Sequence, residues 1–554
     1  MSSILGFSGH ANTDPKNWTK EKMLKLADKF VDKGDYQDLY THSDETGLIY
    51  LVHNRLVTVG LETETFSSKD DLAIAFDGKI LNYAEFDDVF QEKDTVSYDS
   101  DTSYEFILYV YRNLIQISEN GSVPEEFEID PDAGETSSEE KNLVQIMNDL
   151  ADGTIDLVTA FKFFFLNVVG DYAFVLHDIT RQKTLMCRGG IGLTPLYYGI
   201  TQLGEFMMSS EKKTLIEDCV IVIPFPPNSY IYDKISGNIP TIHQIQPHLW
   251  NPPDDSVISS IAFESGQATR KTFAIDDLLQ TEIDRNLSVN KLPYGVIVDE
   301  TLQSKIMVKV MHSYSRDLYN QWGKRLHTFS VHLEGYSLHD STQEILDQID
   351  SIHYCYEYTV AQAWAILPQL IYILESTDLD LVLRSLPLYF LLLKIKNVFH
   401  LKTVYHSLGP ELFQNFTDRE DSQKVLQGMS EKYGALTNKL PSAHEMEFEL
   451  PLMAPEILNL LYPLSDEYWN NTDASEDFHL FRTFARRLNF NDTAGETEKA
   501  AEKATLKTGL EALANGLVTD QEFGTGLLIF AANPPSSKLD YYFRKIYLGH
   551  FGNK

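Results

Sequence analysis

The stretch "PYGVIVDETLQSK", residues 293–305, constrains the fold more than any other part of this chain. Branched apolar residues at 296–298 predict a buried strand, and the acidic and hydroxyl residues at 299–301 are typical of a helix N-terminus. A strand that runs directly into a helix is the repeating unit of a doubly wound α/β sheet. Turns of this kind commonly bind phosphate, because free backbone N–H groups and the helix dipole attract anions. Here the turn carries two carboxylates instead.

The rest of the C-terminal half continues the alternation of strands and helices. The pattern predicts a helix over 273–288, a strand over 325–333, long apolar helices to about residue 399 and a strand over 401–408. The Ala/Glu/Lys-rich tract 496–516 predicts a solvated helix. Together these elements predict a doubly wound α/β domain.

The N-terminal half has a different pattern. Short β-type runs such as "GLIYLVH" (47–53) and "LAIAFDGKI" (72–80) alternate with turns, and a helix is predicted over 101–117. The acidic stretch 118–142 is typical of a solvated surface insertion. Because a Pro-rich crossing over 223–255 separates the two patterns, we expect two domains, 1–240 and 241–554.

Charge limits the partners of this chain. Its 554 residues include 81 acidic and 46 basic side chains, a net charge of −35. Nucleic acid and anionic membranes need a basic surface, so neither is expected as a partner. Only three cysteines are present, Cys187, Cys219 and Cys355, which indicates no disulfide framework. With no secretory signal and no membrane-length apolar run, the chain is expected to be cytoplasmic.

Several motifs occur together and in order. They include "HNRL" (53–56), "IAFDGKILNYAEF" (74–86), "GIGLTPLYYG" (190–199), "LHTFSVHL" (326–333) and "NPPSSKLDYYFRKIY" (533–547). In these motifs the chain resembles glutamine-dependent asparagine synthetases over nearly its whole length. The resemblance implies an Ntn-type αββα amidotransferase-like sandwich over 1–240, a synthetase-like PP-loop domain over 241–554, and a homo-oligomer.

The resemblance also implies which residues form the amidotransferase site. Ser2 stands where the family has its catalytic cysteine, and Asp77-Gly78 stands where the family has the Asn-Gly of its oxyanion site. Arg55 and Asp101 match the positions that hold glutamine in the family. An ionised Asp77 cannot donate a hydrogen bond to an oxyanion, and losing such a donor costs about 3–4 kcal/mol.

The nucleotide turn departs further from the family pattern, Ser-Gly-Gly-Leu-Asp-Ser-Ser. The corresponding positions of this chain include Asp299, Glu300, Thr301, Gln303 and Ser304. Both glycines are replaced, the metal-binding aspartate is a glutamine, and two like charges about 4 Å apart cost about 4 kcal/mol at an effective dielectric of 20. We therefore expect no nucleotide in the usual pose and no other cofactor, with Asp299 and Glu300 serving as the N-cap and first-turn residues of the helix.

No metal site is expected either, because His353, Cys355, His400 and His406 match no zinc spacing.

These departures predict that the chain is not an enzyme. The expectation is a degenerate, catalytically inactive member of the family, a pseudoenzyme that acts as a structural or self-assembling scaffold, for example in a filament. Two alternatives stay open. One is a regulatory partner of an active asparagine synthetase paralogue, or an amino-acid sensor that uses Arg55 and Asp101. The other is a residual glutaminase that uses Ser2.

Overall fold

The chain forms two compact units. The computed structural model describes residues 2–10, 13–14, 16–30, 36–44, 47–55, 72–82, 103–123, 143–234, 240–245, 278–284, 293–317, 325–409, 422–454, 457–458, 485, 488 and 496–552. Unit 1 is Met1–Leu249 with Asp421–Glu431, and unit 2 is Trp250–Glu420 with Lys432–Lys554. The expected boundary at 240/241 stays a prediction, because residues 246–277 lie outside the described residues.

Unit 1 contains two antiparallel sheets. The six-stranded sheet has the order β2-β3-β1-β8-β7-β9, and the five-stranded sheet has the order β11-β10-β6-β5-β4. The strands are β1 (Ser2–His10), β2 (Tyr36–Asp44), β3 (Gly47–Arg55), β4 (Leu72–Ile80), β5 (Gly170–Asp178), β6 (Lys183–Arg188), β7 (Tyr197–Thr201), β8 (Phe206–Ser209), β9 (Cys219–Pro224), β10 (Ser229–Asp233) and β11 (His243–Gln244).

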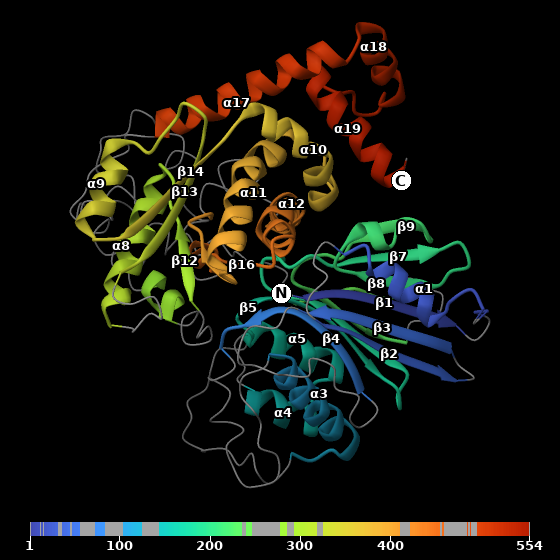
Figure 1. The fold of residues 1–554 in the computed structure, drawn as a ribbon. Coiled ribbons are helices and arrows are strands. Elements are labelled where there is room, and N and C mark those ends of the chain that lie inside the picture. Colours follow the sequence, from blue (N-terminus) through green and yellow to red (C-terminus); the bar gives the residue numbers. More distant parts are fainter. Residues whose placement is uncertain are drawn as a thin grey trace. The chain divides into compact units, whose positions relative to one another are not determined.

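Helices cover the outer faces of these sheets (Figure 1). Between the sheets, Ile4 packs with the small residues Ala73, Ala75 and Ala173. Apolar side chains of α3 (Ser103–Asn120), α4 (Leu143–Ala151) and α5 (Leu157–Asn167) pack on the five-stranded sheet. Helix α1 (Lys20–Ala27) packs on the six-stranded sheet. The layer order confirms the expected αββα sandwich.

The helix expected over 101–117 is longer than the sequence pattern indicates. It is α3, and it ends at Asn120, so the first residues of the expected acidic insertion 118–142 are helical. Residues 124–142 of that insertion lie outside the described residues.

Unit 2 contains one parallel sheet with the order β14-β13-β12-β15-β16. The chain forms β12 in the middle, adds β13 and β14 on one side, and then returns to add β15 and β16 on the other. The order therefore reverses between β12 and β15, which confirms the doubly wound fold. The strands are β12 (Tyr294–Ile297), β13 (His327–Leu333), β14 (Ile352–Tyr358), β15 (Thr403–Tyr405) and β16 (Glu447–Glu449).

Helices lie on both faces of the unit 2 sheet (Figure 1). Helices α8 (Leu302–Asp317) and α9 (Asp340–Gln348) share a core with Val296 of β12. On the other face, Phe390 of α11 (Leu379–Phe399) stacks on Tyr358 of β14. The remaining helices are α10 (Val360–Leu374), α12 (Ser422–Gly434), α13 (Leu440–Ser442), α17 (Glu496–Leu517), α18 (Asp520–Ile529) and α19 (Lys538–Phe551).

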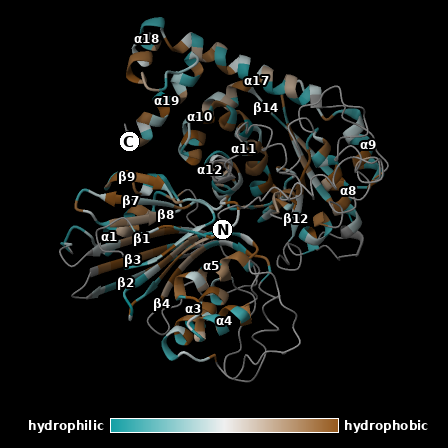
Figure 2. Cartoon of the chain, turned by 180° about the vertical axis from the view of Figure 1, so that it is seen from behind, coloured by the Kyte–Doolittle hydropathy of each residue, from teal (hydrophilic) through white to brown (hydrophobic). Residues whose placement is uncertain are grey.

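Helix α17 carries both hydrophilic and hydrophobic residues along its length (Figure 2). The sequence predicts it as a helix, which is confirmed, although its charged residues also contact the sheet, as described below. Among the helices in the described part of the chain, none combines the length and the apolar character that a bilayer span requires.

Candidate functional site

The first candidate site is built on strands β1, β3 and β4 of unit 1. Antiparallel pairing sets the backbone of Ser2 opposite Arg55. In the facing sheet, Asp77 follows Ala73 and Ala75 at alternate positions of β4, so all three residues share the face that packs between the sheets. The Asp77 side chain is 1% exposed. The fold thus gives Ser2, Arg55 and Asp77 positions in one sandwich, whereas Asp101 lies outside the described residues.

Glycine is required at position 78. Its φ of 99° lies in the left-handed region, and a Cβ there would overlap the backbone carbonyl of Asp171 on the neighbouring strand β5. The Asp77-Gly78 pair therefore has a specific backbone conformation that few other sequences could adopt.

A buried ionic network supports the loop between β6 and β7. Arg188 is 3% exposed and donates to the backbone carbonyls of Gly192, Thr194 and Phe225. Asp171 accepts from the N–H groups of Leu193 and Thr194 on the same loop. Burial raises the pKa of Asp171, although Thr194 and Arg188 partly oppose that shift. The network fixes the motif "GIGLTPLYYG" in the sandwich.

The second candidate site is the turn between β12 and α8 in unit 2. Asp299 accepts a 2.8 Å hydrogen bond from the Thr301 N–H group. The Thr301 hydroxyl in turn accepts from the Ser304 N–H at 3.3 Å, and Ser304 Oγ accepts from the Asp299 N–H at 3.0 Å. Thr301 is therefore the N-cap residue of α8. The expectation that Asp299 and Glu300 are the N-cap and first-turn residues is wrong, because both precede the cap. Gln303 lies in the first turn and is half-buried.

Glu300 serves a different helix from the one that follows it. Its side chain is buried, and it accepts a 2.7 Å hydrogen bond from the His339 N–H and another bond from the Thr342 hydroxyl. His339 is the N-cap residue of α9, and Thr342 lies in that helix's first turn. The Glu300 carboxylate thus occupies the N-terminal end of α9, where the helix dipole favours an anion.

Asp299 is held by a lysine from far along the chain. Lys499 Nζ of α17 lies 2.5 Å from Asp299 Oδ2. Burial alone would raise the pKa of Asp299, but the nearby charges of Lys499 and His406 and the hydrogen bonds to Lys499 and Thr301 hold it well below its usual range. His406 follows β15, across the point where the strand order reverses, and burial lowers its pKa to about 4.

The charged side chains at the carboxyl edge of this sheet are therefore paired with other groups of unit 2. Positions that would attract an external anion are occupied by carboxylates of the chain, and each carboxylate has a partner within unit 2. A phosphate could reach this turn only if Lys499 or the end of α9 exchanged its present carboxylate partner.

Three residues of the segment 375–384, "ESTDLDLVLR", make structural contacts. Glu375 and Lys439 form an ion pair whose side chains are 1% and 2% exposed. Asp378 caps α11 by accepting from the Leu381 N–H at 2.7 Å. Arg384 Nε lies 2.9 Å from Asp380 Oδ2.

The structure separates the histidines considered as metal ligands. His353 contacts Thr328 and Ser330, whereas His406 accepts from the Leu408 N–H. Within the described residues, no three His, Cys, Asp or Glu side chains gather as a metal site.

Fold and site together define a protein class, an amidotransferase-like sandwich joined to a PP-loop-like α/β unit. Comparison with known proteins agrees with this class. Residues 162–229 match the glutamine amidotransferase domain model, and they include β5–β9 and the loop held by Arg188.

Named proteins are similar to this chain over much of its length. The chain is 25% identical over 404 residues to the asparagine synthetase [glutamine-hydrolyzing] of Zea mays, which covers 68% of this chain and 66% of that enzyme. It is 22% identical to the probable asparagine synthetase [glutamine-hydrolyzing] of Dictyostelium discoideum, over 95% of this chain and 90% of that protein. These matches show that the chain is similar to asparagine synthetases and confirm the resemblance in its motifs.

A solved structure of glutamine phosphoribosylpyrophosphate amidotransferase from B. subtilis also matches. It is 12% identical, covers 65% of this chain and 91% of its own, and superimposes with a TM-score of 0.27. The fold class follows from the sheets themselves.

These comparisons contradict the prediction that the chain is not an enzyme. The relatives are named as synthetases, and a glutamine amidotransferase domain is present in this chain. The prediction treated Asp77 as an ionised carboxylate, but the structure shows that its side chain is almost fully buried. A carboxyl group in its protonated form can donate a hydrogen bond.

Sequence reasoning missed the contribution of α17. Lys499 and Glu502 reach the carboxyl ends of β12 and β13, about 200 and 169 residues away along the chain. The Ala/Glu/Lys composition correctly indicates a helix, but composition carries no information on which strands the helix crosses. The signal was the three-residue spacing of the two side chains, which puts them on one helix face.

Proposed function

We propose that this chain is a synthetase-like enzyme whose unit 1 hydrolyses the side-chain amide of glutamine. The names of the relatives state glutamine hydrolysis. The observation that carries the proposal is the register that sets Ser2 opposite Arg55, with Asp77-Gly78 in the facing sheet of the same sandwich.

The chemistry is that of an N-terminal nucleophile. After removal of Met1, the free α-amino group of Ser2 takes the proton of its hydroxyl, and the oxygen attacks the amide carbon of glutamine. The Gly78 N–H and the neutral carboxyl group of Asp77 donate hydrogen bonds to the oxyanion. A carboxyl group kept protonated by its surroundings can fill this role. Ammonia leaves, and water releases glutamate from the ester.

Glutamate release by the full-length protein tests this proposal, once mass spectrometry has verified removal of Met1. Ser2→Ala should abolish the release. Asp77→Asn keeps a hydrogen-bond donor at this position and should retain the release, whereas Asp77→Ala removes the donor and should lower kcat by about 10²-fold, the usual effect of one oxyanion donor. Asp233→Asn, on strand β10, is the matched control and should leave the rate unchanged. If neither the wild type nor Asp77→Asn releases glutamate, the proposal fails.

Strand β9 supports a second proposal, that the chain assembles with copies of itself. This edge strand exposes Val220 at 63%, Ile221 at 49% and Ile223 at 37%, and it contains no charged residue. An edge strand with exposed β-branched residues is a ready template for pairing with another strand. Antiparallel pairing of two β9 strands would give a closed dimer, whereas a filament would need a second surface.

Light scattering at low and high salt tests the assembly. Because copies with a charge of −35 repel one another, added salt should strengthen association. Val220→Lys with Ile221→Glu should yield monomers, whereas Leu528→Lys on α18 alters a residue that is 78% exposed elsewhere and should leave the dimer intact. A wild type that stays monomeric at all salt concentrations contradicts self-assembly. A stable complex with an active synthetase would favour the regulatory alternative.

A further inference from the structure

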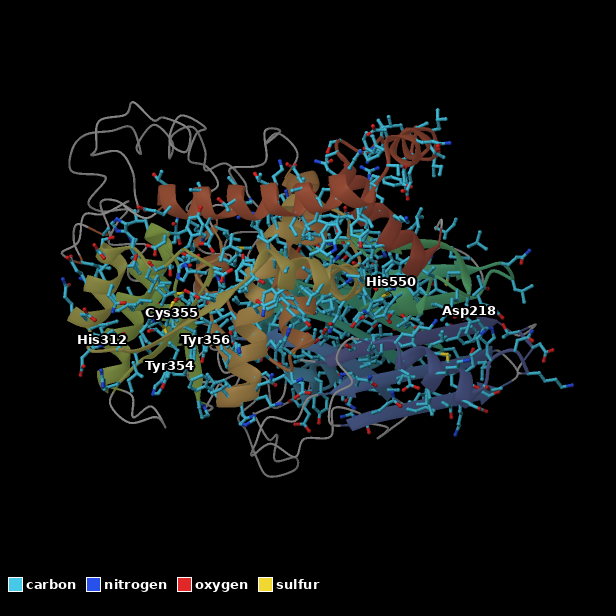
Figure 3. The ribbon with its side chains drawn as sticks, turned by 45° about the horizontal axis from the view of Figure 1, so that its top comes forward. Asp218, His312, Tyr354, Cys355, Tyr356 and His550 are labelled. Atoms are coloured by element: carbon cyan, nitrogen blue, oxygen red, sulfur yellow. The ribbon has the colours of Figure 1, made fainter. Side chains whose placement is uncertain are left out.

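The edge of the unit 2 sheet carries a row of polar side chains outside both sites. Strand β14 alternates Ile352, Tyr354, Tyr356 and Tyr358 on one face with His353, Cys355 and Glu357 on the other. Its parallel partner β13 places Thr328, Ser330 and His332 in register with that second set. Figure 3 labels Cys355 and its chain neighbours Tyr354 and Tyr356.

The neighbours of Cys355 are fixed by hydrogen bonds. His353 contacts Thr328 Oγ1 through Nδ1 and Ser330 Oγ through Nε2, both at 3.0 Å. Cys355 itself is exposed. The cluster therefore combines an accessible thiol with an imidazole whose orientation is set from both ring nitrogens.

A second imidazole approaches the thiol from β13. His332 is 6% exposed, and its Nδ1 lies 3.5 Å from Glu502 Oε2 of α17. Glu502 is held in place because it also accepts from the Leu333 N–H. The other ring nitrogen, Nε2, is buried, and no hydrogen-bond partner for it is found among the described residues. The strand register places Cys355 opposite Ser330, which lies two residues before His332 on the same face of β13.

The charges around the thiol favour its ionised form. Interactions with His332 and His353 lower the pKa of Cys355 to about 6, against the opposing effect of burial. Burial alone would lower the pKa of His332, but interactions with Cys355 and Glu502 raise it to about 9. The acidic groups on neighbouring elements are Glu502 of α17 and Glu357 of β14. A thiolate–imidazolium pair is thus favoured between these two pKa values.

We propose that Cys355, with His332 and Glu502 as positioning residues, is a nucleophilic thiol that forms a mixed disulfide with low-molecular-weight disulfides. The thiol is exposed at a sheet edge, and a buried imidazole that a carboxylate orients lies on the same face of the neighbouring strand. This arrangement of nucleophile, base and orienting acid is the one that activates cysteine in thiol chemistry.

The exchange balances without any further reactant. The Cys355 proton passes to His332, and the thiolate attacks one sulfur of the disulfide RSSR. A Cys355–S–S–R bond forms as the RS–SR bond breaks, and the leaving RS⁻ takes up a proton. The other cysteines, Cys187 and Cys219, are 0% and 1% exposed and belong to unit 1. The product is therefore a mixed disulfide rather than an internal one.

Intact-mass measurement after exposure to glutathione disulfide tests the reaction. The folded full-length protein should gain one adduct, located by peptide mapping at Cys355, and Cys355→Ser should gain none. Adducts on Cys187 or Cys219 with Cys355 unmodified would overturn the proposal, as would a protein that gains no adduct at any disulfide concentration.

The pH dependence separates activation from mere exposure. The thiolate absorbance that distinguishes wild type from Cys355→Ser should titrate with a midpoint near 6. His332→Gln should move the midpoint to above 8, and Glu502→Gln should move it in the same direction by less. The matched control is His327→Gln, because His327 lies on the same strand but stacks on Tyr354 of the opposite face. A wild-type midpoint above 8, or no shift in His332→Gln, contradicts the role of His332.

Discussion

The two candidate sites differ in how they depart from the family pattern. In unit 1 the Asp77 change sits in a sandwich whose supporting contacts, such as those of Arg188 and Asp171, serve the fold. In unit 2 the changed residues are themselves supporting contacts, because Asp299 binds Lys499 and Glu300 binds the N-terminal end of α9. A substitution at the first site should therefore alter chemistry, whereas a substitution at the second should alter stability.

The largest expected effect tests the supporting network of unit 1. Arg188→Met leaves three buried carbonyls without their donor and Asp171 without a nearby cation, which should cost about 3–5 kcal/mol of unfolding free energy. Urea unfolding, with hydrogen exchange of β5 and β6 peptides, measures it. Arg325→Met removes an arginine that is 48% exposed and pairs with the exposed Asp350, and it should cost at most about 1 kcal/mol. An equal loss of unfolding free energy in the two variants would contradict the supporting role of Arg188.

Acid should destabilise unit 2 through His406. Its folded-state pKa of about 4 lies below the ordinary value of 6.5. The unfolded chain therefore binds a proton first, and stability should fall as pH drops from about 6.5 towards 4. Between pH 7 and pH 5 the loss should be about 2 kcal/mol.

His406→Asn keeps an acceptor for the Leu408 N–H and should flatten this part of the pH profile in urea unfolding. His400→Asn, at an exposed position after α11, is the control and should retain the wild-type profile. A wild-type profile that His406→Asn leaves unchanged would show that other groups cause the acid loss.

Glu300→Ala should cost about 1–2 kcal/mol. The substitution removes an anion from the N-terminal end of α9 and two hydrogen bonds, to the His339 N–H and the Thr342 hydroxyl. Faster hydrogen exchange in the first turn of α9 would accompany the loss. Glu498→Ala removes a carboxylate 3.9 Å from His339 that is 54% exposed, and its effect should stay within about 0.5 kcal/mol. No difference between the two variants would refute the role of Glu300.

The smallest expected effect is that of Lys499→Ala, about 0.5–1 kcal/mol at neutral pH, because the lysine side chain is 45% exposed. Because folding lowers the pKa of Asp299, the ion pair contributes to the free energy of unfolding above about pH 4, and this contribution is lost as pH falls. Wild type and variant should therefore converge in acid. A gap in unfolding free energy that widens in acid would contradict this ion pair.

Local patterns predicted much of the fold. The apolar run at 296–298 and the polar residues after it correctly gave β12 and α8, because strand and helix boundaries depend on nearby residues. Strand β14 was missed, although Tyr354 and Tyr356 alternate with His353 and Cys355 in the two-residue period of a strand. This segment consists mainly of aromatic and polar residues, whereas the prediction of strands relied on branched apolar residues.

The partners of the site residues could not be predicted in the same way. Thr301, rather than Asp299, caps α8, and that choice depends on where Asp299 and Glu300 find other partners. Those partners, Lys499 and the end of α9, lie about 200 and 39 residues away. Sequence spacing places residues within an element, but it does not specify which distant elements meet at a sheet edge.

Helix α17 places Lys499 and Glu502 within one helical turn, one against the turn after β12 and the other against His332. Two binding events that each displace the same helix are thermodynamically coupled, and the coupling is reciprocal. Consider an anion that draws Lys499 away from Asp299. If its binding changed the affinity of Cys355 for a modifying group, then modification of Cys355 would change the affinity for the anion by the same factor. If the proposed thiol reaction displaces α17, this helix would couple it to the turn after β12.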